Sequence, residues 1–205
     1  MSLMIDQYQT IETPSEGIYK EKGSKFIAFA YPVFSENEFK EKLQQLKKDY
    51  HDARHHCYAF RLGADLQQYR FSDDGEPSST AGKPIFGQIQ SFKLTNIAII
   101  VIRYFGGTKL GVGGLITAYR AAAKDAIENA NIISRTVDNV YEIQFGYEIM
   151  SDVMNFIKKQ NLEVISQTLE EKGVIQFRIR QSEAESIVEL LKKIEGLKIE
   201  FLTTI

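Results

Sequence analysis

Residues 97–129 read IAIIVIRYFGGTKLGVGGLITAYRAAAKDAIEN, and they determine how the N-terminal half of the chain can fold. The run 97–102 holds only β-branched residues and alanine, which predicts a strand buried on both faces. Residues 106–114 then contain five glycines. The alanine-rich run 115–129 predicts a helix, because alanine is the best helix former. Its small side chains also let this helix pack close to a sheet.

The segments before residue 97 alternate between strand and helix patterns. Two apolar-rich runs on either side of Lys22-Gly23-Ser24 predict a β-hairpin. Ser35 and Glu38 form a capping box, and apolar residues then recur along one helical face as far as Tyr50. Further elements are expected at 54–62 (strand), 68–71 (strand) and 84–92 (helix).

A boundary is expected near 132–137, and a simpler order follows it. Ser182 to Glu185 form a second capping box, and Gly196 is expected to end the helix that this box begins. The order βαββαβ is typical of ferredoxin-like domains. The sequence therefore predicts an α+β fold with two domains, residues 1–133 and 134–205. The expected elements are strand 140–145, helix 148–160, strands 162–169 and 174–179, a helix from 182 to about 195, and strand 197–202.

The composition is that of an ordinary globular protein with 205 residues, 43% of them hydrophobic, and a formal charge of −2. No apolar run is long enough to cross a membrane, and the polar start of the chain does not resemble a signal peptide. A single cysteine fits a reducing compartment, so we expect a cytoplasmic protein without a membrane partner. Residues 51–125 hold nine Lys/Arg and six Asp/Glu, which is compatible with an anionic partner.

All three histidines and the single cysteine lie within residues 51–57. On a strand, His55 and Cys57 would face one side and His56 the other. A zinc site would need about four ligands, and no second Cys/His cluster exists. A Cys–His nucleophile pair is the second alternative. The third is that Cys57 is a small core residue beside a surface or site-facing His55.

The segment 71–84, FSDDGEPSSTAGKP, carries three carboxylates beside a turn glycine. Asp73, Asp74 and Glu76 could bind a hard cation, although the spacing is not that of a calcium loop. The neighbouring hydroxyls, backbone N–H groups and Lys83 could instead hold a phosphate at a helix start. The remaining alternative is a solvated turn with helix caps.

The glycine-rich segment follows a buried strand and precedes a helix, a position where such loops cradle phosphates. It matches neither the P-loop nor the G-x-G-x-x-G pattern. Arg103, Lys109 and Arg120 could contact phosphates, and Tyr104 or Phe105 could stack on a base. Alternatively, the glycines only permit a tight connection.

Two of these segments, 71–84 and 103–115, resemble the signature of the IMPACT family in its bacterial, YigZ-like branch. The segments KGSKF (22–26) and ARHHCYA (53–59) are also similar to that family, and the resemblance covers essentially the whole chain. Ser79 is a departure, because the family commonly carries glycine there.

The resemblance implies an N-terminal domain similar to one shared by a small-subunit ribosomal protein, elongation factor G and the GHMP kinases. It implies a C-terminal domain like a ferredoxin-like module of elongation factor G. The resemblance implies that eukaryotic relatives act in translational control through protein partners, by way of an additional N-terminal domain that we do not expect here. No settled activity comes with the bacterial branch, so function must be inferred from the site itself.

Three interpretations follow. The first is a non-catalytic factor that binds RNA or the ribosome and regulates translation. The second is an enzyme acting on a small phosphorylated substrate with a divalent cation, and the third is a protein-interaction module. No catalytic residue, metal ligand set or resident cofactor is assigned. The residues expected to bind nucleic acid or another anion are Arg54, His55, Lys83, Arg103, Tyr104, Gly106, Gly107, Lys109, Gly111, Gly113 and Arg120, with Asp73, Asp74 and Glu76 as an acidic motif.

Overall fold

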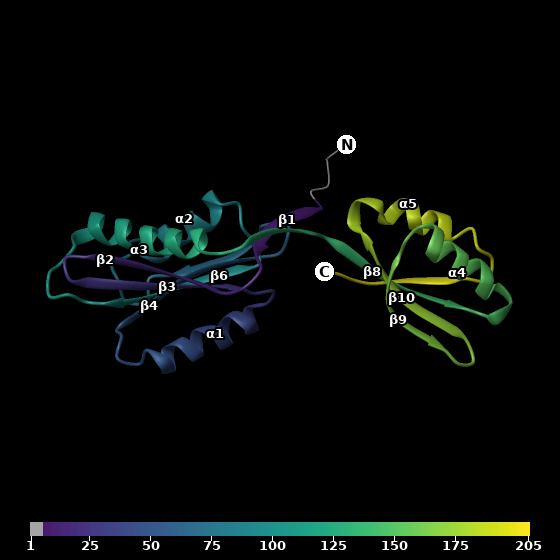
Figure 1. Cartoon of the computed structure of the whole chain (residues 1–205), viewed down its shortest axis with the longest axis horizontal. Coiled ribbons are helices and arrows are strands. Elements are labelled where there is room, and N and C mark those ends of the chain that lie inside the picture. Colours follow the sequence, from purple (N-terminus) through teal and green to yellow (C-terminus); the bar gives the residue numbers. More distant parts are fainter. Residues whose placement is uncertain (1–5) are drawn as a thin grey trace. The chain divides into compact units, whose positions relative to one another are not determined.

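The computed structural model describes residues 6–205 and has an α+β fold divided into two units (Figure 1). The first unit is Tyr8–Arg135. The second is Thr136–Ile205 together with Asp6 and Gln7 from the start of the chain. Residue 133, where the sequence places the end of the first domain, lies inside a strand.

The first unit is built on a five-stranded sheet in which every neighbouring pair is antiparallel. The uninterrupted apolar run 97–102 forms most of the central strand and is wholly buried, and the strand continues through the buried Arg103 to Tyr104. In spatial order the strands are β2 (Ser15–Glu21), β3 (Ser24–Pro32), β6 (Ile97–Tyr104), β4 (His55–Leu62) and β5 (Gln68–Ser72). The predicted hairpin at 22–24 is confirmed as the β2–β3 connection.

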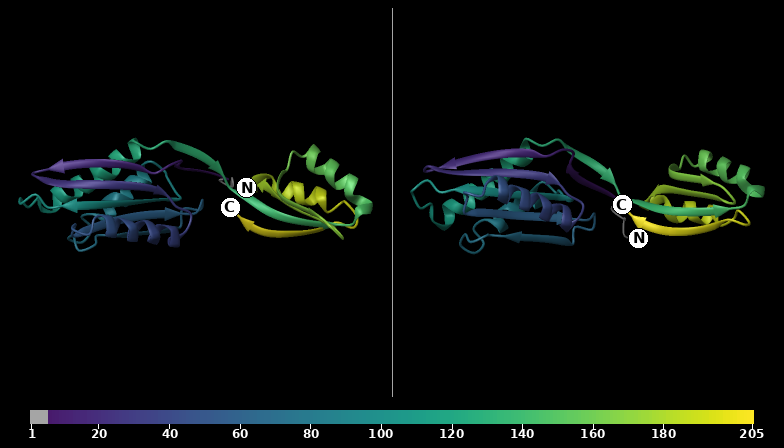
Figure 2. Two further views of the ribbon diagram at one scale, coloured as in Figure 1. Left: turned by 60° about the horizontal axis from the view of Figure 1, so that its bottom comes forward. Right: turned by 90° about the horizontal axis from the view of Figure 1, so that it is seen from below.

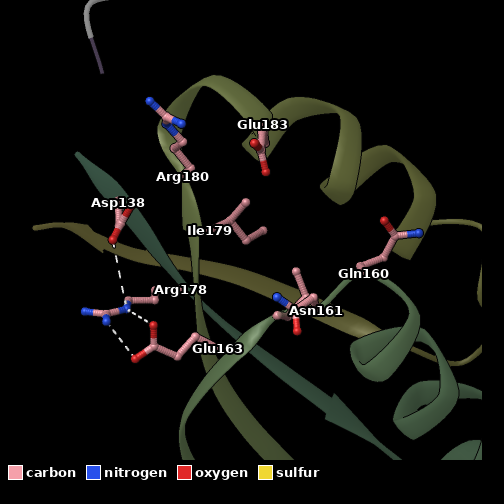
Figure 3. A pocket seen from close by; sticks show the side chains of 9 residues that line it. Asp138, Gln160, Asn161, Glu163, Arg178, Ile179, Arg180 and Glu183 are labelled. Carbon is pink, nitrogen blue, oxygen red and sulfur yellow. Dashed lines mark hydrogen bonds and ion pairs between the residues drawn. The ribbon is translucent and has the colours of Figure 1, made fainter. Parts of the chain in front are cut away.

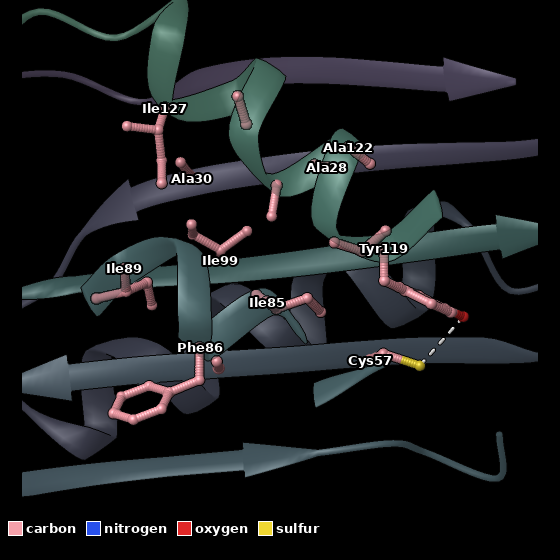
Figure 4. Close-up of a cluster of buried hydrophobic side chains, with 14 of the residues drawn as sticks. Ala28, Ala30, Cys57, Ile85, Phe86, Ile89, Ile99, Tyr119, Ala122 and Ile127 are labelled. Atoms are coloured by element: carbon pink, nitrogen blue, oxygen red, sulfur yellow. Dashed lines mark hydrogen bonds between the residues drawn. The ribbon is translucent and has the colours of Figure 1, made fainter. Parts of the chain in front are cut away.

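Helices cover both faces of this sheet (Figures 1 and 2). Helices α2 (Gly82–Ser91) and α3 (Gly111–Glu128) lie on one face and α1 (Glu36–Asp49) on the other. Ile99 and Val101 of β6 pack in the core beneath α2 and α3, and Figure 4 shows Ile99 there. Ile100 and Ile102 pack in the core beneath α1. The prediction that this strand is buried on both faces is confirmed.

Helix α3 lies so close to β2 that no side chain fits between them at one point. A Cβ added to Gly17 would collide with the backbone nitrogen of Ala126 and lie 2.8 Å from the carbonyl oxygen of Ala122. This close packing confirms the prediction that the small side chains of α3 let the helix approach the sheet. It brings the helix backbone into contact with the sheet.

Differences from the sequence prediction include one helix start and two short strands. Helix α3 begins at Gly111 and not at Leu115, so the last glycines of the glycine-rich segment belong to its first turn. Glycine weakens a helix interior, but the helix packs into the core from Leu115 and Ala118 onward. Two short strands, β1 (Gln7–Ile11) and β7 (Ile132–Thr136), were not predicted, and they form a separate two-stranded sheet.

The second unit has the predicted ferredoxin-like order and strand arrangement. Its sheet order is β11-β8-β10-β9, antiparallel throughout, and α4 and α5 cover one face (Figure 1). None of the helices within residues 6–205 has the length and apolarity to cross a membrane. The elements are β8 (Asp138–Phe145), a 3-10 turn (Tyr147–Ile149), α4 (Met150–Lys159), β9 (Glu163–Leu169), β10 (Gly173–Arg180), α5 (Gln181–Leu191) and β11 (Lys198–Thr204).

Of the two predicted capping boxes, the first is confirmed and the second is wrong. The Glu38 backbone N–H donates to the Ser35 hydroxyl at 3.2 Å, ahead of α1. Helix α5 begins before Ser182, after Arg180, and has no side-chain cap. Ser182 and Arg180 instead hydrogen-bond to Asp6 and hold the pKa of that carboxyl below its usual range. The Arg180 Nε atom lies 2.6 Å from Asp6 Oδ2.

Gly17→Ala should lower the free energy of unfolding by about 1–3 kcal/mol, because the added methyl group must displace the α3 backbone. Urea unfolding followed by circular dichroism measures this change. Gly87→Ala is the matched control, since the space around that glycine of α2 is open. It should leave stability unchanged or raise it by up to about 1 kcal/mol. Equal losses in both variants would contradict the close approach at Gly17.

Candidate functional site

The segments singled out in the sequence meet at one end of the five-stranded sheet. Antiparallel pairing places His55, the first residue of β4, opposite Arg103 near the end of β6. It places Lys25, near the start of β3, opposite Tyr104. Strand β5 ends at this same end, because Ser72 pairs with Tyr58. We call this region, residues 22–25, 52–55, 72–83 and 103–114, the motif end of the first unit.

The glycine-rich loop is packed against the β2–β3 turn. The Gly106 backbone N–H donates to the Ser24 hydroxyl at 3.1 Å. A Cβ on Gly106 would collide with the backbone of Gly23, so this contact requires glycine. Gly107, Gly111 and Gly113 have open space where a Cβ would be, which leaves their backbone accessible. Helix α3 also begins without a side-chain cap or an acidic residue in its first turn.

A buried ion pair lies beneath the loop. Arg103 Nη1 donates to Glu76 Oε1 at 2.6 Å, and the Tyr119 hydroxyl donates to the same oxygen at 2.8 Å. The two charged side chains are 9% and 4% exposed. The Arg103 guanidinium also lies over the rings of Phe26 and Phe105, at 5.5 and 5.6 Å from their centroids. Arg103 is therefore held as a structural cation, and Glu76 neutralises it.

The two aspartates of the acidic motif are used by the chain itself. Asp73 Oδ1 accepts the backbone N–H groups of Ala81 and Gly82, both at 2.9 Å, where α2 begins. Its other oxygen accepts the N–H of Ser79 at 2.8 Å. Asp74 Oδ2 accepts the N–H of His56 at 2.6 Å. Asp73 thus caps α2, and Asp74 fastens the turn to β4. Helix capping is what the third alternative for this segment, a turn with helix caps, predicted.

The alternative in which this segment binds a phosphate requires free N–H groups at the start of α2, and Asp73 already accepts them. Because its carboxylate already accepts the first N–H groups of the helix, a phosphate would have to displace it. Among residues 6–205, no three His, Cys, Asp or Glu side chains are grouped as a metal site requires.

Cys57 and the histidines are arranged as core and turn residues. Burial raises the pKa of the Cys57 thiol. Its sulfur lies 2.9 Å from the carbonyl oxygen of Asp73 and 3.3 Å from the Tyr119 hydroxyl, either of which can accept the thiol proton. Figure 4 shows the contact with Tyr119. His55 Nδ1 lies 2.8 Å from the carbonyl oxygen of Asp74. His56 is buried, and burial lowers its pKa. A protonated, enclosed thiol is a poor nucleophile.

Three of the predicted cations are exposed at the motif end and, within residues 6–205, form no ion pair. They are Arg54, Lys83 and Lys109. Phe105 is 59% exposed beside them. Tyr104 is less available, because its hydroxyl donates to Asp52 at 2.7 Å, and this hydrogen bond raises the Tyr104 pKa to about 12.

One predicted residue lies elsewhere, and one contributor was missed. Arg120 is on the exposed side of α3, nine residues beyond Gly111, which is about 14 Å along the helix axis. Lys22 is exposed in the turn that contacts the glycine-rich loop. The pairing of β3 with β6 brings Lys22 to the glycine-rich loop, and this pairing cannot be predicted from the sequence. The only sequence signal for Lys22 was that it belongs to the KGSKF segment.

The second unit has a small polar hollow of about 180 Å³ (Figure 3). Its cations are already paired. Arg178 Nη2 lies 2.6 Å from Glu163 Oε1, and Arg180 is bound to Asp6. The hollow therefore offers no free charge to an anion. Its lining residues are Asp138, Gln160, Asn161, Leu162, Glu163, Arg178, Ile179, Arg180 and Glu183.

The fold and the motif end together define a two-unit α+β protein with a glycine-rich loop over a buried Arg–Glu pair. Residues 22–127 match the Impact N-terminal domain. The chain is 31% identical over 156 residues to the IMPACT family member YvyE of Bacillus subtilis, covering 76% of this chain and 72% of that protein. The IMPACT family member YigZ of Escherichia coli is 36% identical over 134 residues, 64% of this chain and 66% of that protein.

The chain belongs to the IMPACT family, as the sequence resemblance predicted. A Protein IMPACT homolog of Saccharomyces cerevisiae is 32% identical over 94 residues, 44% of this chain and 36% of that protein. A crystal structure described as a hypothetical protein aligns over 98% of this chain and 99% of its own, with a TM-score of 0.73 and 26% identity. The two-unit fold therefore has a solved counterpart along its full length.

Asp73→Ala should lower the free energy of unfolding by about 1–3 kcal/mol, because three backbone N–H groups lose their acceptor. Denaturant unfolding measures the loss. Asp73→Asn keeps one acceptor oxygen and should fall between the wild type and the alanine variant. A wild-type stability for Asp73→Ala would contradict the capping role.

The Cys57 thiol should resist modification in the folded protein, because burial raises its pKa and encloses it. Cys57 is the only cysteine, so titration with Ellman's reagent at about pH 8 reports on it alone. The folded protein should react slowly, and one thiol should react at once after unfolding in guanidinium. Reaction of the folded protein at the unfolded rate would revive the nucleophile alternative.

Proposed function

We propose that this protein is a non-catalytic RNA-binding factor associated with translation, and that the motif end of its first unit binds the RNA. The observation that carries the proposal is the set of exposed, unpaired cations Arg54, Lys83 and Lys109 around an open glycine-rich loop. Lysine, arginine and backbone N–H groups are the usual ligands of nucleic-acid phosphates. Phe105 adds an exposed ring on which a base can stack.

The enzyme alternative finds less support at the same place. Each carboxylate that it would use to hold a cation is engaged within the protein: Asp73 by α2, Asp74 by His56, and Glu76 by Arg103. The thiol is buried. Within the described part of the motif end, the exposed charged side chains without a partner are cations, whereas the exposed Asp52 accepts the Tyr104 hydroxyl. Free cations beside an exposed aromatic ring suit binding of an anionic polymer better than bond cleavage. The link to translation rests on the family resemblance.

Binding should weaken steeply with salt, because phosphate contacts release counterions. Three contacts predict a loss of roughly 20- to 40-fold in affinity between about 50 and 200 mM salt. Lys109→Glu should weaken binding to structured RNA and to purified ribosomes, and should reduce the slope of log K against log salt by about 1. Filter retention measures binding to structured RNA, and co-sedimentation measures binding to ribosomes.

Lys193→Glu is the matched control, since it makes the same charge change at an exposed lysine of the second unit. It should bind as the wild type does. Neither substitution should shift the thermal midpoint much, because exposed lysines add little stability. Equal weakening by both would indicate a general charge effect, and no binding by the wild type at either salt would refute the proposed function.

A further inference from the structure

Beside the motif end, three aromatic rings form a partly exposed strip. Tyr69 and Phe71 lie two residues apart on β5, the edge strand of the sheet, and are 53% and 39% exposed. Phe86 of α2 stacks on both. Its ring centroid is 4.6 Å from that of Tyr69, with planes inclined by 18°, and 5.8 Å from that of Phe71, with planes inclined by 29°. Phe86 itself is buried at the side of the core away from α3 (Figure 4).

This packing fixes how the exposed rings are presented. A surface aromatic side chain normally samples several rotamers, but stacking on the anchored Phe86 ring limits that freedom. Since Tyr69 and Phe71 alternate with Arg70 along the strand, both rings lie on the same face of the sheet. Arg70 lies on the opposite face and pairs with Glu36 at 3.6 Å. Tyr69 and Phe71 therefore form a preformed pair of exposed rings, carried by Cα atoms about 7 Å apart along β5.

The charges around the strip favour an anionic partner. Lys83 is exposed and precedes Phe86 by three residues in α2, which places both on one side of the helix. No acidic residue occurs in 66–71 or 83–90, the segments that form the strip and its border. The neighbouring polar side chains of these segments are glutamines, which can hydrogen-bond to bases but carry no charge.

We propose that the exposed rings of the strip, Tyr69 and Phe71, are a base-stacking platform for single-stranded RNA that is held in place by the buried Phe86 and is continuous with the motif end. Strand β5 ends at Ser72, where the motif end begins, so one strand of RNA can reach both. Unpaired bases have free faces to stack on aromatic rings, whereas the bases of a duplex are already stacked on each other. This inference rests on the proposed function and narrows its ligand from RNA in general to unpaired RNA.

Tyr69→Leu tests the platform, because leucine keeps an apolar contact with Phe86 but removes the flat ring. The probes are a 12-nucleotide oligouridylate and a 12-base-pair RNA duplex, each binding measured by fluorescence anisotropy at about 50 mM salt. The dissociation constant for oligouridylate should rise at least about fivefold, the lower end of what loss of one stacked base produces. Duplex affinity and the salt slope should not change, because every cation remains.

Phe201→Leu is the control, since Phe201 is 52% exposed and lies in the second unit. It should bind both probes as the wild type does. A second readout uses the absence of tryptophan from the chain. In Tyr69→Trp, the introduced indole should lose fluorescence when oligouridylate binds, because a stacked base quenches it, and duplex should leave it unchanged.

The outcomes separate this inference from the proposed function. Wild-type binding of oligouridylate that Tyr69→Leu leaves intact, with no quenching in Tyr69→Trp, would overturn the platform and leave RNA binding in place. Equal losses for oligouridylate and duplex would also overturn it. Absence of binding to either probe by the wild type would overturn both, and would leave the aromatic strip as a surface for a protein partner.

Discussion

The ion pair between Arg103 and Glu76 is the constraint on which the motif end depends. Two charges taken out of water at this depth stabilise a protein only if their remaining polar atoms are also satisfied. Here the Tyr119 hydroxyl supplies a further hydrogen bond to Glu76, and two aromatic rings flank the guanidinium. The buried Arg103 Nε has no hydrogen-bond partner among residues 6–205, so Glu76 carries most of the compensation for this charge. One carboxylate thereby joins the central strand β6, the acidic turn and helix α3.

Because Glu76 joins these three elements, residues that are far apart in the sequence lie together at the motif end. The acidic turn cannot move away from β6 without leaving the buried Arg103 uncompensated, which costs about 3–5 kcal/mol in comparable pairs. The acidic turn also contains Asp73, which caps α2. The position of this helix start determines where Lys83 and Phe86 lie. The exposed cations and the exposed rings of the aromatic strip are therefore positioned by core residues, Phe86 among them.

Most elements of the fold could be predicted from the sequence, whereas the contacts within the candidate site could be predicted only in part. The run at 97–102 predicted the central strand because no polar residue interrupts it, and the Ser35 capping box predicted the start of α1. Strands β1 and β7 were missed because five-residue segments without alternation give no periodic signal. The roles of Arg103 and Glu76 were not predictable from composition, because 27 residues separate them and only the strand order brings them together.

The second unit differs from the first in what its sheet exposes. By strand register, the face away from α4 and α5 carries Glu142, Gln144 and Gln176, and both glutamines hydrogen-bond to Glu142 and lower its pKa. Ferredoxin-like domains that bind RNA on the open sheet stack bases on aromatic side chains there. This face has none on its four strands by register, so the features suited to RNA gather in the first unit.

The place of Asp6 has a consequence for how the gene can be divided. The second unit is not one continuous stretch of codons. Its largest part starts at Thr136, yet Arg180 bonds to Asp6, and the Val137 N–H donates to the Asp6 carbonyl oxygen at 2.8 Å. Immediately afterwards the chain enters β1, which pairs with β7 in the first unit. A gene fragment that begins at codon 136 would encode a second unit without Asp6 and Gln7. Recombination between relatives would therefore exchange the two units cleanly only if the codons for these residues were exchanged together with the 3′ part of the gene.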